Sequence, residues 1–402
     1  MISDRVDALL RSRGEDVERA GHTGRKVVGY LPGGYVPEEM IYASGAIPLC
    51  LSHGGEAKAA DQGLSILPGV ICPFARAQVG EMLLDTNPFY SSLDLLVVPS
   101  TCQHMKKIGD VWEYYRGPQV FKLGVPYEHD KDFELQYFRD RLGALKERLE
   151  ALTGTTITDA ALTEAIAVYN RLRALFEALS LTRRSPHPPL SSLEFMRLNH
   201  ASLYADPVAM ADLLEAVYQG LPLREVSAPP PDAPPADVPR TPAHRQGKRP
   251  RVLLTGPNLA FGDHDVLKAV AAAGADLVVE EVFEGVRDYW HRIDATGDPL
   301  DALARGYLID KRPAAFMRGS TRKRLEFVKQ LIREFDVSGV LWYQLLCCEF
   351  YDEEAFFFER GLRPDGIPML MVESDYHALD SGPLKTRLEA FVETLVGGPI
   401  DA

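Results

Sequence analysis

The feature that most constrains the fold is a pattern that occurs twice: a short apolar run that ends at Gly or Pro and precedes helical patterning. Lys26–Leu31 stops at Pro32-Gly33-Gly34, and Arg251–Thr255 stops at Gly256-Pro257. Short apolar runs of this kind are typical of strands buried on both faces, and their alternation with helices favours parallel sheets covered on both sides. We therefore predict an α/β protein with two Rossmann-like or flavodoxin-like domains and a helical segment between them.

Further strand and helix patterns indicate where the predicted domains begin and end. Additional strands are predicted at Ala46–Leu51, Leu93–Pro99, Ala275–Glu281, Val337–Trp342 and Ile367–Glu373. Apolar residues at three- and four-residue spacing predict helices over Phe138–Leu152 and Asp159–Leu179, and the segment that begins Thr158-Asp159 offers a hydroxyl or a carboxylate to cap the second. The predicted parts are an N-terminal helix (1–25), a first α/β domain (26–130), a helical segment (131–226), a proline-rich linker (227–250) and a second α/β domain (251–402).

Charge and cysteine content exclude several classes of function. The chain has 57 acidic and 44 basic residues, a net charge of −13, and an acidic surface repels the phosphates of nucleic acid. No run approaches the roughly 20 apolar residues of a membrane helix, and Met1–Asp7 lacks the pattern of a secretory signal. Five widely spaced cysteines do not form a disulfide framework. We expect a cytoplasmic protein that binds neither nucleic acid nor membrane.

The positions of the cysteines are the main functional signal. Cys102 and the pair Cys347-Cys348 come after apolar strand patterns, and Cys72 lies at a similar break. Ligands of doubly wound sheets gather at the carboxyl ends of the strands. Thiolates are soft donors that suit iron–sulfur clusters or zinc. Motifs for a phosphate loop, a dinucleotide site, a serine hydrolase or a zinc protease are absent from the sequence.

Each of these cysteines also has a simpler interpretation. A free cysteine is most often a buried apolar filler, and the chain has no C-x-x-C pair. Cys50, between Leu49 and Leu51, is interpreted as such a filler.

The same caution applies to the charged residues near these motifs. Glu38 and Glu39 are interpreted as partners of a helix dipole rather than substrate ligands. Arg76 suits either a site or the solvated surface, and His104 is interpreted as an exposed loop residue rather than a proton donor.

Several blocks together resemble the 2-hydroxyacyl-CoA dehydratase family, which includes the cluster-bearing subunits of benzoyl-CoA reductase. The blocks, over roughly Lys26 to Leu395, are Tyr35-Val36-Pro37-Glu38-Glu39, Ala43-Ser44-Gly45-Ala46-Ile47-Pro48, Ile71-Cys72, Pro99-Ser100-Thr101-Cys102, Cys348-Glu349, Gly366-Ile367-Pro368 and Glu373-Ser374-Asp375-Tyr376. Gly366 follows Cys348 by eighteen residues, and this spacing aligns Cys348, rather than Cys347, with the family's last ligand.

The resemblance implies a [4Fe-4S] cluster held by Cys72, Cys102 and Cys348. It also implies a related second subunit, in a heterodimer or homodimer, and an ATP-dependent iron–sulfur activator that injects an electron. The substrate would be a CoA thioester, reduced to a ketyl radical anion in a dehydratase or a reductase. Gly33-Gly34 stands where some subunits of the family have a serine ligand, so no fourth ligand is assigned. Because Cys347 adjoins Cys348, a relative with a larger, double-cubane cluster remains an alternative.

Two alternative functions remain. One is a non-catalytic partner subunit that bears a cluster or relays electrons, and the other is a zinc-binding structural protein. The sequence does not choose between a hydroxyacyl-CoA and an aromatic acyl-CoA. In the leading hypothesis, the cleft between the two α/β domains receives the thioester.

Overall fold

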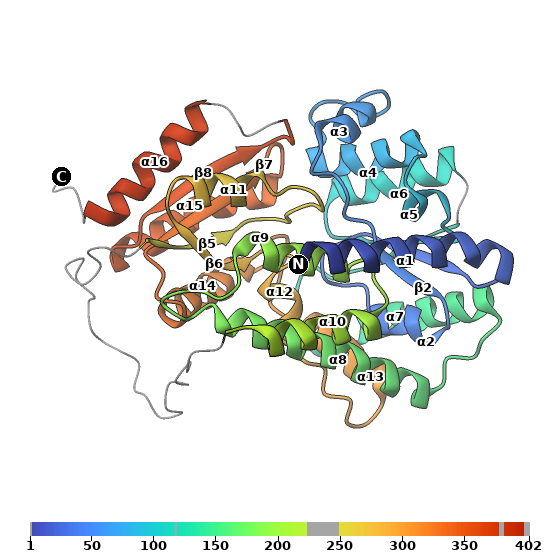
Figure 1. Cartoon of the computed structure of the whole chain (residues 1–402). Helices are drawn as coiled ribbons and strands as arrows, with labels where there is room; N and C mark the ends of the chain where they lie inside the picture. The colour runs from blue at the N-terminus through green and yellow to red at the C-terminus, as the bar shows by residue number, and fades with distance from the viewer. Residues whose placement is uncertain (1, 117–118, 223–248, 378–381, 398–402) are drawn as a thin grey trace.

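The computed structural model describes residues 2–116, 119–222, 249–377 and 382–397. Two α/β lobes lie side by side, and a group of helices runs beneath both (Figure 1). The proline-rich linker predicted over 227–250 lies almost entirely outside the described residues. None of the described helices combines the length and the hydrophobicity needed to cross a membrane.

The first lobe is built on a parallel four-stranded sheet in the order β2-β1-β3-β4. Its strands are β1 (Val27–Tyr30), β2 (Ile47–Cys50), β3 (Leu95–Pro99) and β4 (Gln119–Leu123). The first three are fully buried, as their apolar runs predict, whereas β4 is a half-exposed edge strand that the sequence analysis missed. Its helices are α2 (Glu38–Ala43), α3 (Ala57–Gly63), α4 (Pro73–Leu84), α5 (Pro88–Ser91) and α6 (Gln103–Tyr115).

The second lobe repeats this topology with a parallel sheet in the order β6-β5-β7-β8. Its strands are β5 (Arg251–Thr255), β6 (Asp276–Glu281), β7 (Gly339–Leu345) and β8 (Met369–Ser374), all at predicted positions. Its helices are α11 (Asp265–Ala272), α12 (Val286–Tyr289), α14 (Ser320–Glu334), α15 (Glu349–Leu362) and α16 (Gly382–Gly397). Helix α13 (Pro299–Arg305) lies instead beneath the first lobe, against α7 and α8, which are described below. A π-helical turn at Gly306–Asp310 follows α13, and a 3-10 turn at Arg363–Asp365 follows α15. The two lobes therefore share one strand order, which is flavodoxin-like.

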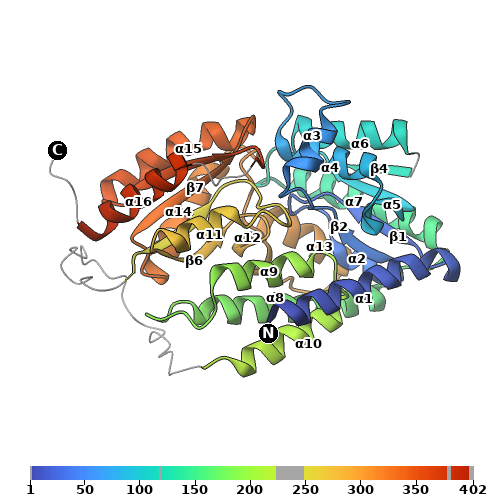
Figure 2. The same ribbon diagram turned by 45° about the horizontal axis from the view of Figure 1, so that its top comes forward.

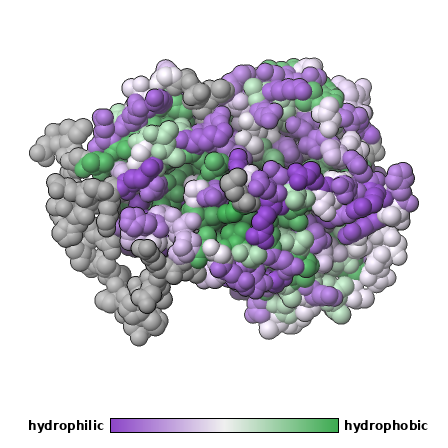
Figure 3. All heavy atoms as spheres, in the orientation of Figure 1, coloured by the Kyte–Doolittle hydropathy of each residue, from purple (hydrophilic) through white to green (hydrophobic). Residues whose placement is uncertain are grey.

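Four further helices lie together along the lower part of the molecule, most clearly in Figure 2: α1 (Ile2–Thr23), α8 (Asp159–Thr182), α9 (Ser192–Ser202) and α10 (Pro207–Gly220). Helix α7 (Asp132–Thr153) lies against β4 and α2 of the first lobe. Helix α8 begins as predicted, because the Thr158 hydroxyl accepts a hydrogen bond from Ala161 N. Helix α7 begins six residues before its predicted start, because the Glu134 carboxylate accepts from the amides of Asp130 and Lys131. The charged outer side of α1 is visible in Figure 3 as a hydrophilic band.

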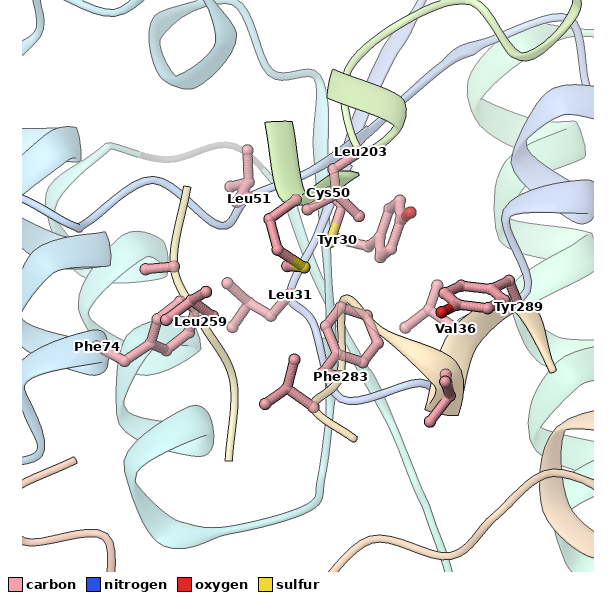
Figure 4. Close-up of a cluster of buried hydrophobic side chains, with 14 of the residues drawn as sticks. Tyr30, Leu31, Val36, Cys50, Leu51, Phe74, Leu203, Leu259, Phe283 and Tyr289 are labelled. Atoms are coloured by element: carbon pink, nitrogen blue, oxygen red, sulfur yellow. The ribbon is translucent and has the colours of Figure 1, made fainter. Parts of the chain in front are cut away.

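The carboxyl ends of the two sheets face each other, and the loops after β2 and β5 touch. His53 and Phe261 form a parallel β-bridge, and Phe261 N donates to Ser52 O at 2.7 Å. A Cβ on Gly55 would lie 1.9 Å from Asp263 N, so only glycine permits this approach. Side chains from both lobes share one core, where Leu31 and Cys50 pack near Leu259 and Phe283 (Figure 4).

A cluster of three histidines lies beside this contact, with His200 buried and His53 and His264 half-buried. His53 Nδ1 is 2.6 Å from the Tyr204 hydroxyl, and His200 Nδ1 is 3.2 Å from His264 Nε2. His200 Nε2 donates to Leu259 O at 2.9 Å. Burial lowers the pKa of His53 and of His200 to about 3, and the pKa of His264 to about 4. All three rings are therefore neutral in the folded protein at neutral pH.

This cluster predicts acid sensitivity. Histidines in the unfolded chain become protonated near pH 6.5. As the pH falls, the unfolded state therefore takes up protons before the folded state does. The free energy of unfolding should therefore be highest above pH 6.5 and fall toward pH 4, by up to about 1.4 kcal/mol per pH unit per histidine. Urea unfolding of His200→Gln at pH 7 and pH 5 should show a smaller pH dependence than the parent. His187→Gln, at an exposed site, is the control; equal pH dependence in both variants would contradict the prediction.

Candidate functional site

Each of the three proposed ligand cysteines occupies the residue that immediately precedes a helix. Cys72 precedes α4, Cys102 precedes α6 and Cys348 precedes α15. Cys102 follows β3 and Cys348 follows β7, which are the equivalent strands of the two lobes. Cys72 instead follows a turn, so only two of the three positions come directly after a strand. Figure 1 shows that α4 and α6 belong to one lobe and α15 to the other.

Three helix N-termini are thus directed at the cysteines, and a helix N-terminus stabilises negative charge. Met105 N, three residues after Cys102, donates a hydrogen bond to Cys102 Sγ at 3.4 Å. Burial raises the pKa of Cys72 and of Cys348, and the backbone amides of Ala75 and Tyr351, at the same spacing, act in the lowering direction. The same local geometry therefore supports a thiolate at all three positions.

The three thiols also influence one another across the lobes. Burial, with a smaller contribution from Cys102, raises the pKa of Cys72 to about 12. Burial raises the pKa of Cys348 well above its ordinary value, and both Cys72 and Cys102 add to that rise. The pKa of Cys102 is raised by burial as well. Neutral thiols are therefore the resting state of the bare site, and a positively charged metal centre would displace their protons.

All three cysteines line one cavity between the lobes. Its volume is about 120 Å³, close to the roughly 150 Å³ of an engineered cavity that holds benzene. The other lining residues come from loops of both lobes and are mostly apolar or aromatic: Pro32, Gly33, Gly34, Tyr35, Phe74, Ala75, Thr101, His104, Met105, Pro257, Asn258, Phe283, Arg287, Lys311, Arg312, Ala314, Phe316, Leu345, Phe350 and Tyr351. Gly33-Gly34 follows β1 and Pro257-Asn258 follows β5, so equivalent loops of the two lobes build the cavity.

The donor set fits a cluster better than a single ion. Among the described residues, one group of three or more His, Cys, Asp or Glu side chains brings its ligand atoms within 4.8 Å of one another, namely Glu128, Asp130 and Glu134. Thiolates that bind separate irons of a cubane need not converge on a single atom. Two carboxylates of this acidic group already have partners within the protein. Glu134 accepts hydrogen bonds from the amides of Asp130 and Lys131, and Glu128 pairs with Lys131 and Arg318.

The structure bears on two neighbouring residues, and the interpretation of one of them was wrong. Arg76, for which the sequence left a site role and the solvated surface open, is 5% exposed on α4, where it acts to lower the pKa of Cys72, although burial dominates that pKa. His104, interpreted as an exposed loop residue, lies in the first turn of α6 and is half-buried. His104 Nδ1 accepts a hydrogen bond from Cys72 N at 3.3 Å, and burial lowers the pKa of this histidine. The burial of both residues could not be predicted, because the packing of α4 against α6 has no signature in either segment alone.

Glu38 and Glu39 lie in the first turn of α2, as predicted, but neither lines the cavity. Glu39 is fully buried and pairs with Arg173 at 2.7 Å, so a specific ion pair accompanies the dipole interaction. Burial, with smaller contributions from Asp288 and Glu39, raises the pKa of Glu38 to about 8.

The two remaining cysteines behave differently. Cys50 is fully buried in the core, as expected for a filler (Figure 4). Cys347 is half-buried, has a left-handed backbone (φ 60°) and does not line the cavity. Cys347 nevertheless contributes to the raised pKa of Cys72, which burial dominates, so its sulfur is not remote from the site.

Sequence reasoning missed the polar residues of the cavity. Asn258 and Lys311 both line it, yet neither belongs to a recognisable motif. The position of Asn258 after β5 is the available signal, since loops at strand carboxyl ends carry ligands. Lys311 follows the π-helical turn, and no local pattern in the sequence indicates where its side chain goes.

Comparison with known proteins gives one consistent result. A family model described as the D-component of 2-hydroxyglutaryl-CoA dehydratase matches residues 34–395. The chain is 26% identical over 364 residues to an Escherichia coli protein named as a dehydratase subunit, YjiM, covering 90% of this chain and 89% of that protein. It is 25% identical to one of the benzoyl-CoA reductase subunits of Thauera aromatica, covering 81% and 79%. It is 26% identical to the beta subunit of (R)-2-hydroxyglutaryl-CoA dehydratase from Acidaminococcus fermentans, covering 92% and 93%.

Proposed function

Because the chain belongs to the 2-hydroxyglutaryl-CoA dehydratase D-component family, we propose that it is the iron–sulfur subunit of an acyl-CoA dehydratase or reductase. In this proposal Cys72, Cys102 and Cys348 hold a [4Fe-4S] cluster in the cavity between the lobes. The observation that carries the proposal is that three cysteines far apart in the sequence line one cavity. Three thiolates leave one iron of a cubane with an open position, which is what a substrate-binding cluster requires.

The chain's own residues prepare the cavity in three ways. The starts of α4, α6 and α15 place helix N-termini beside the sulfurs, where they favour the thiolate form. Phe74, Phe283 and Phe316 give the cavity apolar walls, which lower the local dielectric and strengthen every electrostatic interaction inside it. Gly33 and Gly34 bring backbone without side chains to the cavity wall, so they contribute no fourth ligand.

The reaction assigned to the site is one-electron chemistry on a CoA thioester. When bound and reduced by an ATP-dependent iron–sulfur activator, the cluster would supply one electron to the thioester carbonyl and give a ketyl radical anion. The relatives are named as beta subunits of dehydratases or as one of the subunits of benzoyl-CoA reductase, which supports a related second subunit here. All five cysteines are free, which supports a reducing, cytoplasmic location.

Anaerobic purification followed by iron and sulfide analysis tests the proposal. We expect a brown protein with about four irons and four sulfides per chain, whose spectrum bleaches on reduction by dithionite. A colourless protein that contains no iron after anaerobic reconstitution with iron and sulfide would overturn it. Zinc at about one per chain, without charge-transfer absorption, would support the structural alternative instead.

A further inference from the structure

The loop after β8 carries a tyrosine whose hydroxyl has no hydrogen-bond partner. Tyr376 lies two residues after Ser374, the last residue of β8, and is 5% exposed. Its hydroxyl oxygen is buried and bonds to none of the residues that the structure describes. A buried polar group without a partner is costly, and nearly all such groups in folded proteins are satisfied. The hydroxyl of Tyr376 therefore calls for a partner that the folded chain alone does not supply.

The backbone of the same residue is strained. Tyr376 has a φ of 69°, in the left-handed region that residues other than glycine rarely adopt. The turn is held by Tyr376 N, which donates to Ser374 Oγ at 3.2 Å. Strained residues persist only where the surrounding structure holds them, and they cluster at functional sites. The ring of Tyr376 is thus kept in its buried position despite the cost to the backbone.

This loop reaches from the second lobe to the first. A Cβ on Gly54, which lies in the loop after β2, would be 3.7 Å from Tyr376 Cε2 and 2.8 Å from Ala77 Cβ of α4. The next residue crosses between the lobes as well, because His377 Nε2 lies 3.3 Å from Asp61 Oδ1 of α3. The ring of Tyr376 therefore lies at the boundary of the two lobes, beside Gly54 and α4.

Two of the proposed ligands belong to the elements around this ring. Helix α4 begins directly after Cys72. Strand β8 pairs with β7, and Leu346 N, two residues before Cys348, donates to Ser374 O at 3.0 Å. Burial raises the pKa of Tyr376, and four groups act in the same direction: Asp263, Cys72, Glu284 and Cys348. Tyr376 is thus electrostatically coupled to a sulfur from each lobe.

Neither of the two carboxylates in this set is the partner of the hydroxyl. Asp263 Oδ2 accepts from the hydroxyl of Tyr343, and Glu284 Oε2 accepts from Leu259 N at 2.9 Å. Within the described part of the chain, neither is bonded to Tyr376. The two sulfurs remain, and a bound metal centre converts them from neutral thiols to thiolates, which are stronger hydrogen-bond acceptors.

The cavity between the lobes is not where this hydroxyl acts. Cys72 and Cys348 line the cavity, whereas Tyr376 is not among the described residues that line it. The hydroxyl therefore approaches the sulfurs from outside the cavity. It is placed to serve the ligand sulfurs rather than a molecule bound in the cavity.

We propose that the Tyr376 hydroxyl donates a hydrogen bond to a ligand sulfur of the bound cluster, at Cys72 or Cys348, and thereby raises the reduction potential of the cluster. The inference rests on the proposed function. The reduced cluster carries one more negative charge than the oxidised cluster, and a hydrogen bond to a ligand sulfur stabilises that charge. Tyr376 acts through the sulfurs and is neither a fourth ligand nor a substrate-binding residue.

The variant Tyr376→Phe, which removes the hydroxyl and keeps the ring, tests the inference in the full-length chain. After anaerobic reconstitution it should bind about four irons, as the parent should. In a titration with dithionite, which supplies one electron per cluster, its midpoint potential should be more negative. At the midpoint of the parent, the ratio of reduced to oxidised cluster should be about 10-fold lower, as the loss of one hydrogen bond produces.

The unloaded chain provides a second measurement. Without a cluster, Tyr376→Phe should unfold at the same urea concentration as the parent or at a higher one, because it loses a hydroxyl that has no partner. Tyr90→Phe is the matched control. Tyr90 is also buried beside α4, but its hydroxyl donates to Gln78 Oε1 and accepts from His53 N at 3.2 Å. Tyr90→Phe should lower the urea midpoint and leave the potential unchanged.

The outcomes separate the inference from the proposed function. An unchanged potential in Tyr376→Phe overturns the inference and leaves the proposed function intact. A lower urea midpoint of the unloaded variant, or its failure to fold, would show that the hydroxyl already has a partner, such as a bound water, and also overturns the inference. Loss of iron from Tyr376→Phe alone would make Tyr376 a ligand and overturn it as well. If the parent binds no cluster, the proposed function itself fails, and the inference fails with it.

Discussion

Replacement of Cys72, Cys102 or Cys348 by alanine is expected to reduce the bound iron from about four atoms per chain to less than one. Each of these cysteines supplies one of only three thiolates in the cavity lining, so each variant leaves two. Two thiolates do not retain a cubane against loss to solvent. The measurement is iron and sulfide content after anaerobic reconstitution, together with the visible absorption of the cluster.

Two other cysteines provide internal controls. Cys50→Ala should retain the cluster and lose only stability, because Cys50 is a core residue with no exposure. Cys347→Ala should retain four irons if three ligands hold a single cubane, whereas loss of part of a larger iron content would favour a double-cubane cluster. A Cys102→Ala variant that keeps its full iron content would contradict the ligand assignment.

Replacement of Arg183 by methionine is expected to lower the free energy of unfolding by about 3–5 kcal/mol, the usual cost of a buried charge left without its partner. Arg183 follows α8, and its guanidinium pairs with Glu280 of β6 at 2.6 Å, with both side chains fully buried. Arg183 also donates to Leu277 O at 2.9 Å. The ion pair joins the lower helices to the second lobe, so its loss should also weaken that attachment.

Urea unfolding of matched variants tests this prediction. Arg171→Met removes two ion pairs of an arginine that is 44% exposed, with Asp212 and Glu215, and should cost less than about 1 kcal/mol. Arg183→Met combined with Glu280→Leu should recover part of the loss, because no unpaired charge remains. If Arg183→Met unfolds within about 1 kcal/mol of the parent, the buried pair does not have the assigned role.

The repeated topology explains why a site forms between the lobes. In both sheets the strand order changes direction between the first and third strands, and ligands of such sheets bind at that point. Cys102 follows the third strand of the first lobe, and Cys348 follows its counterpart in the second. When two such edges face each other, their binding loops enclose a common space. The repeated topology therefore produces a cavity with a cysteine from each lobe, to which Cys72 adds a third.

Much of the fold could be predicted from the sequence because its signals are local. Continuous apolar runs such as Leu95–Pro99 have to be buried on both faces, which specifies central strands of a parallel sheet. The edge strand β4 was missed because it is half-exposed, so its segment lacks the continuous apolar run that identified the other strands. The ordered family blocks likewise singled out Cys72, Cys102 and Cys348, since each block is a short run of residues and is also local.

The sequence by itself determined the two parallel sheets, the helices between them, the family and the three cysteines. Only the tertiary structure decided that these cysteines line one cavity, that Arg76 is buried and His104 half-buried beside them, and that Asn258 and Lys311 line the same space. The physical reason is that strand and helix patterns report which face of a segment is buried. The charge and hydrogen bonding of a site depend on which distant segments meet there, and that is settled by packing between the lobes.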